Sequence, residues 1–242
     1  MSRLERYPDG PQAAAACGAQ ILDWLDHAIA EQGQATLAIS GGSSPRSMFE
    51  MFARTKFGWD QVHLFWVDER GVRPDDSQSN FKLADDAWLA PAQFPRANVH
   101  RIEGELPAQT AAQRYSAALM KFFKLAPGEM PRFDAIHRGM GPDAHTASLF
   151  PGEPLIEDRS GLAAAVWVEK FKQWRITLLP GVLEVARHTA MLVTGADKAQ
   201  ALAAVLSAPY NPLEFPAQIA TRKQDPAVWF VDAAAAAGAE NA

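Results

Sequence analysis

An acid and a histidine two residues apart follow two closely spaced glycines in the segment 139–152, GMGPDAHTASLFPG. The segment comes directly after Phe133–Ile136, a short apolar run typical of a buried strand. Glycines let the backbone turn sharply and approach a ligand. Asp143 could orient the imidazole of His145, which can act as a general base near neutral pH. The segment could therefore be a catalytic corner, although an ordinary strand-to-helix loop with a surface histidine would carry the same residue types.

A second glycine segment, SGGSSPR at residues 40–46, follows the predicted strand Thr36–Ile39. Backbone N–H groups, hydroxyls and a nearby cation are what a bound phosphate requires. The candidate contacts to such an anion are Gly41, Gly42, Ser43 and Arg46. We expect Ser44 to cap the following helix and Pro45 to take its first position. The spacing matches neither a Walker loop nor a dinucleotide-binding fingerprint.

Two further predicted strands also end at charged residues. Asp68 and Arg70 follow the strand Val62–Val67, and Lys198 follows Thr189–Thr194. Asp68 could exchange a proton or merely cap a turn, and each cation could hold an anionic ligand or be a solvated surface charge. Ligands of open parallel sheets bind beyond the carboxyl ends of the strands. We therefore expect these side chains to converge with the histidine segment at one edge of a sheet.

The elements that must position these residues alternate between strands and helices along nearly the whole chain. Several strands are continuous apolar runs, which favour a parallel sheet covered on both faces. We therefore expect an α/β fold with a modified doubly wound, largely parallel sheet and helices on both faces. We also expect one domain over residues 1–242, with a frayed alanine-rich tail at 233–242. Further expected strands are 99–102, 163–168, 175–179 and 227–231, and expected helices are 11–32, 80–89, 107–123, 180–187 and 197–206, with others starting at Pro45 and near Thr146.

Composition excludes several classes of function. The 242 residues carry a net charge of −5 and have an ordinary hydrophobic content of 48%, so the basic surplus of a nucleic-acid binder is missing. An anionic substrate would need locally placed cations. The single cysteine, Cys17, allows no intrachain disulfide and has the helical spacing of a small core residue. Neither a signal peptide nor a membrane-spanning run is evident, and we expect a cytoplasmic protein without a membrane partner.

Metal and serine-hydrolase motifs are also missing from the sequence. There is no HExxH, no pair of cysteines at ligand spacing and no G-x-S-x-G elbow. We therefore expect neither a metal site nor serine-based catalysis.

Taken together, the segments resemble the 6-phosphogluconolactonase family. The resemblance runs in order from about Leu37 to Trp229, and the histidine and Asp-Glu-Arg motifs are its most specific parts. The wider superfamily includes glucosamine-6-phosphate deaminase. The matching segments are residues 40–45 (SGGSSP), 66–70 (WVDER) with Ser79–Asn80, 139–152, Arg175–Thr177 and 195–198 (GADK).

The resemblance implies hydrolysis of 6-phospho-glucono-1,5-lactone to 6-phosphogluconate in the oxidative pentose phosphate pathway, without a metal or organic cofactor. It implies that His145 is the catalytic histidine and that Asp143 and Asp68 are the acids beside it. The partner would be a small phosphorylated sugar lactone, bound by a monomer or small homo-oligomer. The implied substrate-binding residues are Gly41, Gly42, Ser43, Arg70 and Lys198, to which Arg46 is added only for its position after the glycine loop.

Three departures from the family pattern leave alternatives open. Ala144 stands where the family usually has glycine and would be strained at a positive φ. His137–Arg138 replaces apolar residues, and Glu184 stands where asparagine is usual. A relative that binds a sugar phosphate without turnover therefore remains possible. The deaminase is a second alternative, which the absence of a carboxylate between residues 146 and 151 disfavours.

Overall fold

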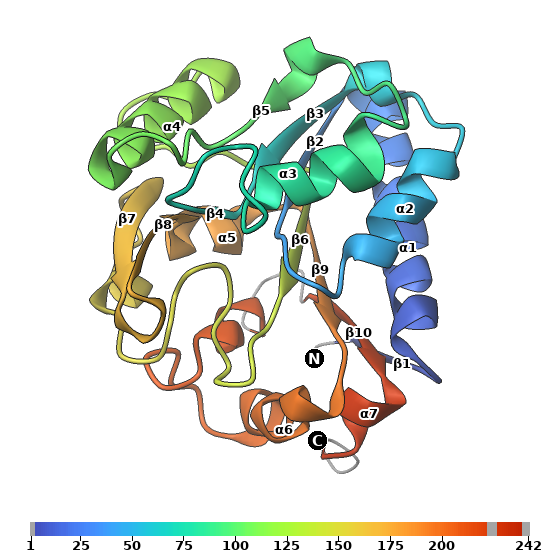
Figure 1. Ribbon diagram of the computed structural model, residues 1–242, viewed down its shortest axis with the longest axis vertical. Coiled ribbons are helices and arrows are strands. Elements are labelled where there is room, and N and C mark those ends of the chain that lie inside the picture. Colours follow the sequence, from blue (N-terminus) through green and yellow to red (C-terminus); the bar gives the residue numbers. More distant parts are fainter. Residues whose placement is uncertain (1–2, 222–226, 239–242) are drawn as a thin grey trace.

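The computed structural model describes residues 3–221 and 227–238. Its larger sheet has seven strands in the order β1-β10-β9-β6-β2-β3-β5, and every pair is parallel. Figure 1 shows it running through the centre of the molecule. The predicted fold class is confirmed. The strands are β1 (Arg3–Tyr7), β2 (Ala35–Ile39), β3 (Val62–Trp66), β5 (Val99–His100), β6 (Ala135–Gly139), β9 (His188–Val193) and β10 (Val228–Asp232).

Helices cover both faces of this sheet. Side chains alternate along a strand, so Ala190 and Leu192 of β9 join the core formed with α1 and α2, while Met191 and Val193 join a second core formed with α6 and α7. The helix α4 instead packs against the strands β7 and β8. The helices are α1 (Gly10–Gln32), α2 (Arg46–Arg54), α3 (Asn80–Ala84) with a π-helical turn (Asp85–Leu89), α4 (Ala108–Phe123), α5 (Pro180–Val185), α6 (Ala199–Ser207) and α7 (Ala233–Ala236).

Local sequence signals explain where the longest helix, α1, begins and ends. The Asp9 side chain accepts a hydrogen bond from the backbone N–H of Gln12, which is the usual role of an N-cap. Gly33 adopts the left-handed conformation with φ 79° and stops the helix. The buried face includes Cys17, which is fully buried as expected. The predicted helix 11–32 is therefore confirmed almost to the residue.

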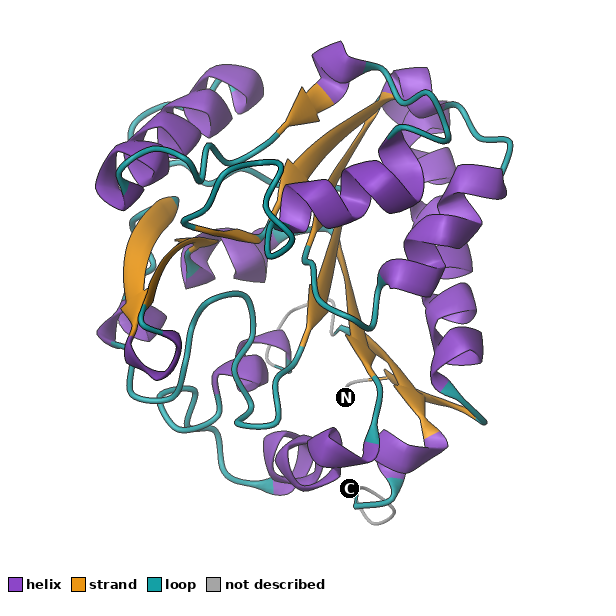
Figure 2. Ribbon diagram, viewed as in Figure 1, coloured by secondary structure: helices purple, strands orange, loops and turns teal. Residues whose placement is uncertain are grey.

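A second, antiparallel sheet contains three strands: β4 (Asp68–Arg70), β8 (Gln173–Leu178) and β7 (Ala163–Val168). The chain passes between the sheets at Val67, whose N–H bonds to Ile39 of β2 and whose carbonyl accepts from Leu178 of β8. Residues 68–70, expected in a loop, are therefore an edge strand. In Figure 2 the long loops lie between this small sheet and the large one.

The predicted helix start near Thr146 is wrong. Residues 142–153 form turns, with one isolated bridge between Thr146 and Leu149. Ala144 and Ala147 have φ values of 64° and 54°, which a right-handed helix cannot contain. The hydroxyls expected to cap a helix bond elsewhere, Thr146 to the carbonyl of Gly139 and Ser148 to Asp68.

The helix after the glycine loop also begins differently from the prediction. Its cap is Pro45 and its first residue is Arg46, without a capping side-chain bond. The Ser44 hydroxyl is instead hydrogen-bonded to the hydroxyl of Thr194, 2.9 Å away. A long-range hydrogen bond to Thr194, at the end of β9, thus takes the place of the helix cap expected of Ser44.

The two ends of the chain differ most from expectation. β1 was not predicted, and it pairs with β10 along the edge of the large sheet. Residues 233–236 of the predicted frayed tail form α7, whose N-cap Asp232 accepts from the N–H of Ala235 and whose last two alanines are buried. Residues 239–242 of that tail lie outside the described residues. Across the described ranges, no helix is both long and apolar enough to cross a membrane.

Candidate active site

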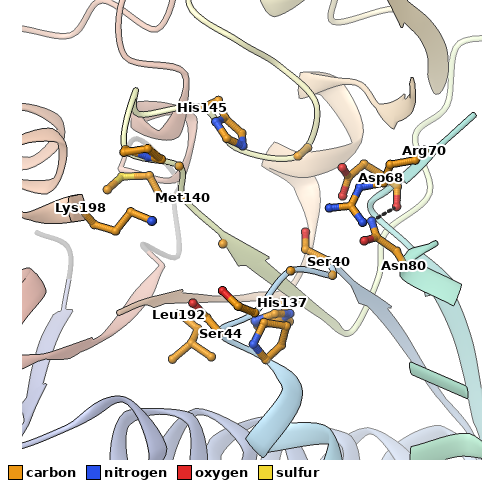
Figure 3. A pocket seen from close by; sticks show the side chains of 18 of the residues that line it. Ser40, Ser44, Asp68, Arg70, Asn80, His137, Met140, His145, Leu192 and Lys198 are labelled. Atoms are coloured by element: carbon orange, nitrogen blue, oxygen red, sulfur yellow. Dashed lines mark hydrogen bonds between the residues drawn. The ribbon is translucent and has the colours of Figure 1, made fainter. Parts of the chain in front are cut away.

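A cavity lies at the carboxyl ends of β2, β6 and β9, where three of the predicted polar loops meet the edge strand β4 (Figure 3). The convergence expected from the parallel topology is therefore observed. The predicted site residues that line the cavity are Gly41, Gly42, Ser43, Asp68, Arg70, His145 and Lys198.

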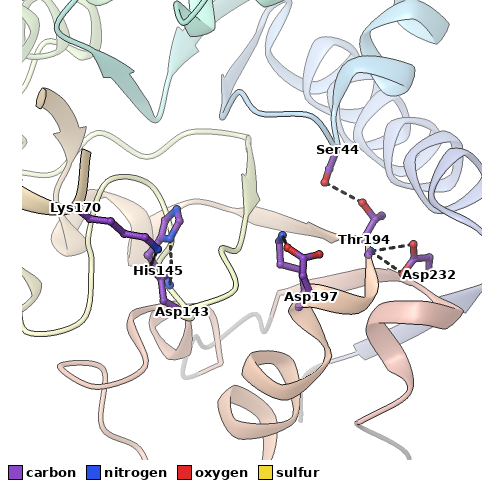
Figure 4. Close-up of polar contacts among 9 residues, drawn as sticks. Ser44, Asp143, His145, Lys170, Thr194, Asp197 and Asp232 are labelled. Atoms are coloured by element: carbon purple, nitrogen blue, oxygen red, sulfur yellow. Dashed lines mark hydrogen bonds and ion pairs between the residues drawn. The ribbon is translucent and has the colours of Figure 1, made fainter. Parts of the chain in front are cut away.

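His145, which lines the cavity, is hydrogen-bonded to Asp143, which is not among the residues that line it. The Nδ1 atom of His145 lies 2.5 Å from Oδ1 of Asp143, and Nζ of Lys170 lies 3.2 Å from the other oxygen (Figure 4). Burial raises the pKa of Asp143, but the hydrogen bond and charge of His145, helped by Lys170, hold that pKa well below its ordinary value. The carboxylate is therefore ionised near neutral pH and can orient the imidazole.

The loop backbone leaves room for the imidazole only because residue 141 is a glycine. A Cβ at Gly141 would lie 2.1 Å from two atoms of the His145 ring. The N–H of Gly141 bonds to the carbonyl of His145 at 2.9 Å, which closes the loop. On its other side the imidazole stacks on Phe150, with ring centroids 4.2 Å apart. The ring is thus held by packing while its side chain keeps 21% of its surface exposed.

Asp68 touches the histidine loop through a serine rather than through the histidine. Its Oδ2 atom accepts a 2.8 Å hydrogen bond from the hydroxyl of Ser148. Its backbone carbonyl accepts from the amide of Asn80, also at 2.8 Å. A Cβ at Gly41 would approach the Asn80 amide oxygen to 1.9 Å, so the glycine loop packs directly against this residue. Asp68, only 5% exposed, therefore joins the histidine loop to Asn80, against which the glycine loop packs.

Three cations surround the cavity. Arg70 and Arg175 are paired across β4 and β8, and both line it together with Lys198. Burial lowers the pKa of Arg175, Asp68 raises it and Arg70 lowers it further. The guanidinium of Arg175 lies over Phe171, 4.9 Å from the ring centroid. In a chain with net charge −5, such a local positive cluster favours an anionic ligand.

Arg46 does not line the cavity. It is exposed at the first position of α2, whose buried face is formed by Met48, Phe49 and Phe52. The helix geometry therefore places it away from the side predicted for an anion contact.

Several cavity-lining residues were not predicted as site residues. Arg175 and Asn80 belong to motifs that carry the family resemblance, so those motifs could have indicated them. Lys170 does not line the cavity but contacts Asp143, and it gave no sequence signal because it reaches that carboxylate from the turn between β7 and β8. His137 was noted only as a departure from the family pattern, yet it also lines the cavity.

The structure also shows the surroundings of the other residues that depart from the family pattern. Ala144 has a positive φ of 64°, the strained conformation considered for this position. Arg138 is fully buried, and its guanidinium nitrogens have no hydrogen-bond partner in the described ranges. Glu184 forms an ion pair with Arg159 at 2.9 Å and does not line the cavity. Among the residues described, no group of three or more His, Cys, Asp or Glu has metal-site geometry.

Comparisons with known proteins agree with these motifs. The family model for glucosamine-6-phosphate isomerases/6-phosphogluconolactonase matches residues 8–229. A 6-phosphogluconolactonase of Nostoc sp. is 39% identical over 236 residues, covering 97% of this chain and 97% of that protein. One of Synechocystis sp. is 37% identical over 209 residues, covering 86% of each. The solved 6-phosphogluconolactonase of Thermotoga maritima has a TM-score of 0.83 and 27% identity, covering 96% of this chain and 100% of that one. The chain therefore belongs to the glucosamine-6-phosphate isomerase/6-phosphogluconolactonase family of enzymes.

Proposed function

We propose that this enzyme hydrolyses 6-phospho-glucono-1,5-lactone to 6-phosphogluconate, as a step of the oxidative pentose phosphate pathway in the cytoplasm. The observation that carries the proposal is that His145, paired with Asp143, lines a cavity bounded by cations. The relatives named 6-phosphogluconolactonase support the same reaction. A lactone is an activated ester, so a general base and a polar pocket suffice without a covalent intermediate.

In the proposed mechanism, His145 acts as the general base. With Nδ1–H donating to Asp143, the lone pair of Nε2 is free to accept a proton from water. The resulting hydroxide adds to the lactone carbonyl carbon and gives a tetrahedral oxyanion. The imidazolium then returns the proton to the ring oxygen as the bond between that oxygen and the carbonyl carbon breaks. The product is the open-chain acid, and the imidazole is regenerated.

Asp143 and the cations supply the electrostatic part of this mechanism. Asp143 holds the reactive tautomer and stabilises the transient imidazolium. A guanidinium at the cavity wall, Arg70 or Arg175, would stabilise the developing oxyanion. The glycine loop and Lys198 would hold the phosphate as a remote handle that fixes the carbonyl near the base. Asp68 would keep the histidine loop in register through Ser148.

The test is a turnover assay with freshly prepared 6-phosphogluconolactone, corrected for spontaneous hydrolysis. We expect His145→Ala to lower kcat by roughly 10²- to 10⁴-fold, because the base is removed. His27→Ala is the matched control, since this exposed histidine lies on α1 and does not line the cavity. Its kcat should equal that of the wild type.

Three outcomes would contradict the proposal. Equal rates for the wild type and His145→Ala would remove His145 from the mechanism. A wild type that binds the product but shows no turnover above background would indicate a sugar-phosphate sensor. Release of ammonia from glucosamine 6-phosphate would indicate a deaminase instead.

A further inference from the structure

His137 is a buried polar side chain that the mechanism does not use. It lies on β6, is 1% exposed, and neither of its ring nitrogens has a hydrogen-bond partner within the described residues. Burial lowers its pKa to about 3, so the imidazole is neutral under ordinary conditions. A neutral imidazole has one N–H donor and one acceptor nitrogen. Buried polar groups are nearly always hydrogen-bonded, so a bound ligand or an ordered water should supply the partner that this ring lacks.

The glycine loop passes over the carboxyl end of β6, two residues beyond His137. In the large sheet β6 stands between β2, which leads into the loop, and β9, which leads to Thr194. The hydrogen bond from Ser44 to Thr194 therefore spans β6 and draws the loop across it. Figure 3 draws the His137 ring on the same side of the cavity as Ser44 and Leu192. The imidazole thus lies beneath the glycine loop, at the side of the cavity formed by β6 and β9.

A second unpaired polar atom lines the cavity just after the end of β2. The hydroxyl oxygen of Ser40 is buried and has no partner in the described ranges, and Ser40 also lines the cavity. Its backbone N–H bonds to the carbonyl of His137 at 3.1 Å, so the two residues are neighbours across β2 and β6. Four tryptophan indoles are also unpaired, at 59, 66, 88 and 229, but none of them lines this cavity. Two further unpaired donors, Nε of Arg70 and Nε of Arg175, also line the cavity, but they belong to β4 and β8, whereas His137 and Ser40 lie on the side of β6 and β2.

We propose that His137 donates a hydrogen bond to the phosphate group of the substrate, beneath the glycine loop. The inference rests on the proposed function, because it assigns the phosphate end of that substrate. A dianionic phosphate offers only acceptor oxygens, so it selects the tautomer whose N–H faces it. The bond adds affinity for an oxyanion without adding a positive charge to the pocket. His137 is thus a binding residue for the phosphate and takes no part in proton transfer at the carbonyl.

The test compares His137→Leu, of similar size and apolar, with His137→Gln, which keeps an N–H donor. KM for the phosphorylated lactone and the inhibition constant of inorganic phosphate should each rise roughly tenfold to hundredfold in His137→Leu, since a hydrogen bond to a charged group is lost. The value of kcat should change less than about twofold, because the reacting atoms are untouched. His137→Gln should recover part of the affinity. Turnover of unphosphorylated glucono-1,5-lactone should be the same in all three proteins.

The outcomes separate this inference from the proposed function. A folded His137→Leu enzyme with wild-type KM and wild-type phosphate inhibition would overturn the inference and leave the proposed reaction intact. A buried water would then be the hydrogen-bond partner of the His137 ring in the wild type. Binding of inorganic phosphate, measured by calorimetry, does not depend on turnover. A wild type that binds phosphate through His137 but hydrolyses no lactone would refute the proposed reaction alone. Thermal unfolding of each variant, with and without phosphate, identifies a loss of affinity that comes from misfolding.

Discussion

At the scale of single residues, the central feature is the division of the Asp143 carboxylate between two partners. One oxygen accepts from His145 and the other faces Lys170. Lys170 is 58% exposed, so its charge is partly screened by water. The orientation of the imidazole thus depends on a partly buried hydrogen bond, while a more exposed cation adjusts how strongly the pair holds a proton.

We predict that Lys170→Met moves the acid limb of the kcat/KM profile to higher pH by roughly 0.2 to 0.7 unit. Lys170 is one of the groups that lower the pKa of Asp143, and its removal makes the carboxylate a stronger proton acceptor. Lys172→Met is the matched control, because Lys172 pairs with Glu169 and not with Asp143. A profile that stays in place in Lys170→Met would mean that the ion pair does not persist in solution.

Ala144 stores backbone strain beside the catalytic pair. It is 2% exposed and has a φ of 64°. We predict that Ala144→Gly changes the free energy of unfolding by less than about 0.5 kcal/mol. Glycine loses the buried methyl group and adds entropy to the unfolded chain, which destabilises the fold. It also relieves about 1 to 2 kcal/mol of left-handed backbone strain, which offsets that loss. Ala111→Gly, at a buried position of α4, should cost about 1.5 to 2 kcal/mol. Urea denaturation measures both, and equal costs would disprove the strain.

At the scale of elements, the histidine loop connects the two sheets. It leaves β6 of the large sheet, and Ser148 then bonds to Asp68 of β4 and to Thr177 of β8. β4 is itself joined to the N-terminus of α3 by Glu69, whose carboxylate accepts four hydrogen bonds, three of them from Ser79, Asn80 and Phe81. Burial raises the pKa of Glu69 and these four bonds counter that shift. The positions of the site residues therefore depend on the hydrogen bonds that join the two sheets.

Gly141→Ala tests how far the loop geometry controls the imidazole. The new Cβ would overlap the His145 ring, and the overlap is relieved only if the ring leaves its stack on Phe150. We predict a fall in kcat of roughly 100-fold from the misplaced base, with a stability loss of only about 1 kcal/mol. Gly10→Ala is the control, because a Cβ there meets its nearest atom at an ordinary 3.5 Å, at the start of α1. Normal turnover in Gly141→Ala would show that the ring position is unimportant for catalysis.

At the scale of the whole molecule, we propose that the chain is a single domain. The small sheet has its edge strand β4 directly after β3, and Val67 is hydrogen-bonded to both sheets. Much of α4 packs on the small sheet, and its buried residues belong to the same apolar core as those of the large sheet. Separate unfolding of the two sheets would expose this shared core. Thermal unfolding should therefore show one transition with equal calorimetric and van't Hoff enthalpies.

Acid stability should reveal the neutral histidine in the interior. The pKa of His137 is about 3 when folded and near 6.5 when unfolded, so the unfolded chain binds more protons between these values. Stability contributed by neutral His137 is therefore lost as pH falls below about 6.5, at up to about 1.4 kcal/mol per pH unit. We predict that His137→Leu makes the dependence of unfolding free energy on pH shallower between pH 5 and 6.5. His27→Leu, at an exposed histidine, should not, and an unchanged slope in His137→Leu would contradict neutral burial.

By itself, the sequence determined the features that depend on neighbouring residues. Apolar periodicity and the glycine stop at position 33 were enough to predict α1, and continuous apolar runs were enough to predict the parallel strands. Because the carboxyl ends of parallel strands lie at one edge of a sheet, the glycine loop, Asp68 and the histidine loop were predicted to lie close together. Motif resemblance identified the family. The chemical roles of these residues stay predictions until the variants are measured.

Only the tertiary structure decided which distant groups meet. The hydrogen bonds from Ser44 to Thr194 and from Ser148 to Asp68, and the pairing of β1 with β10, join segments 80 to about 230 residues apart, so no local pattern encodes them. Ser44 and Ser148 both carried signals for a helix start, yet each hydroxyl took a distant partner. Short-range propensities amount to a few tenths of a kcal/mol to about 1 kcal/mol per residue, and burial and long-range pairing outweigh them.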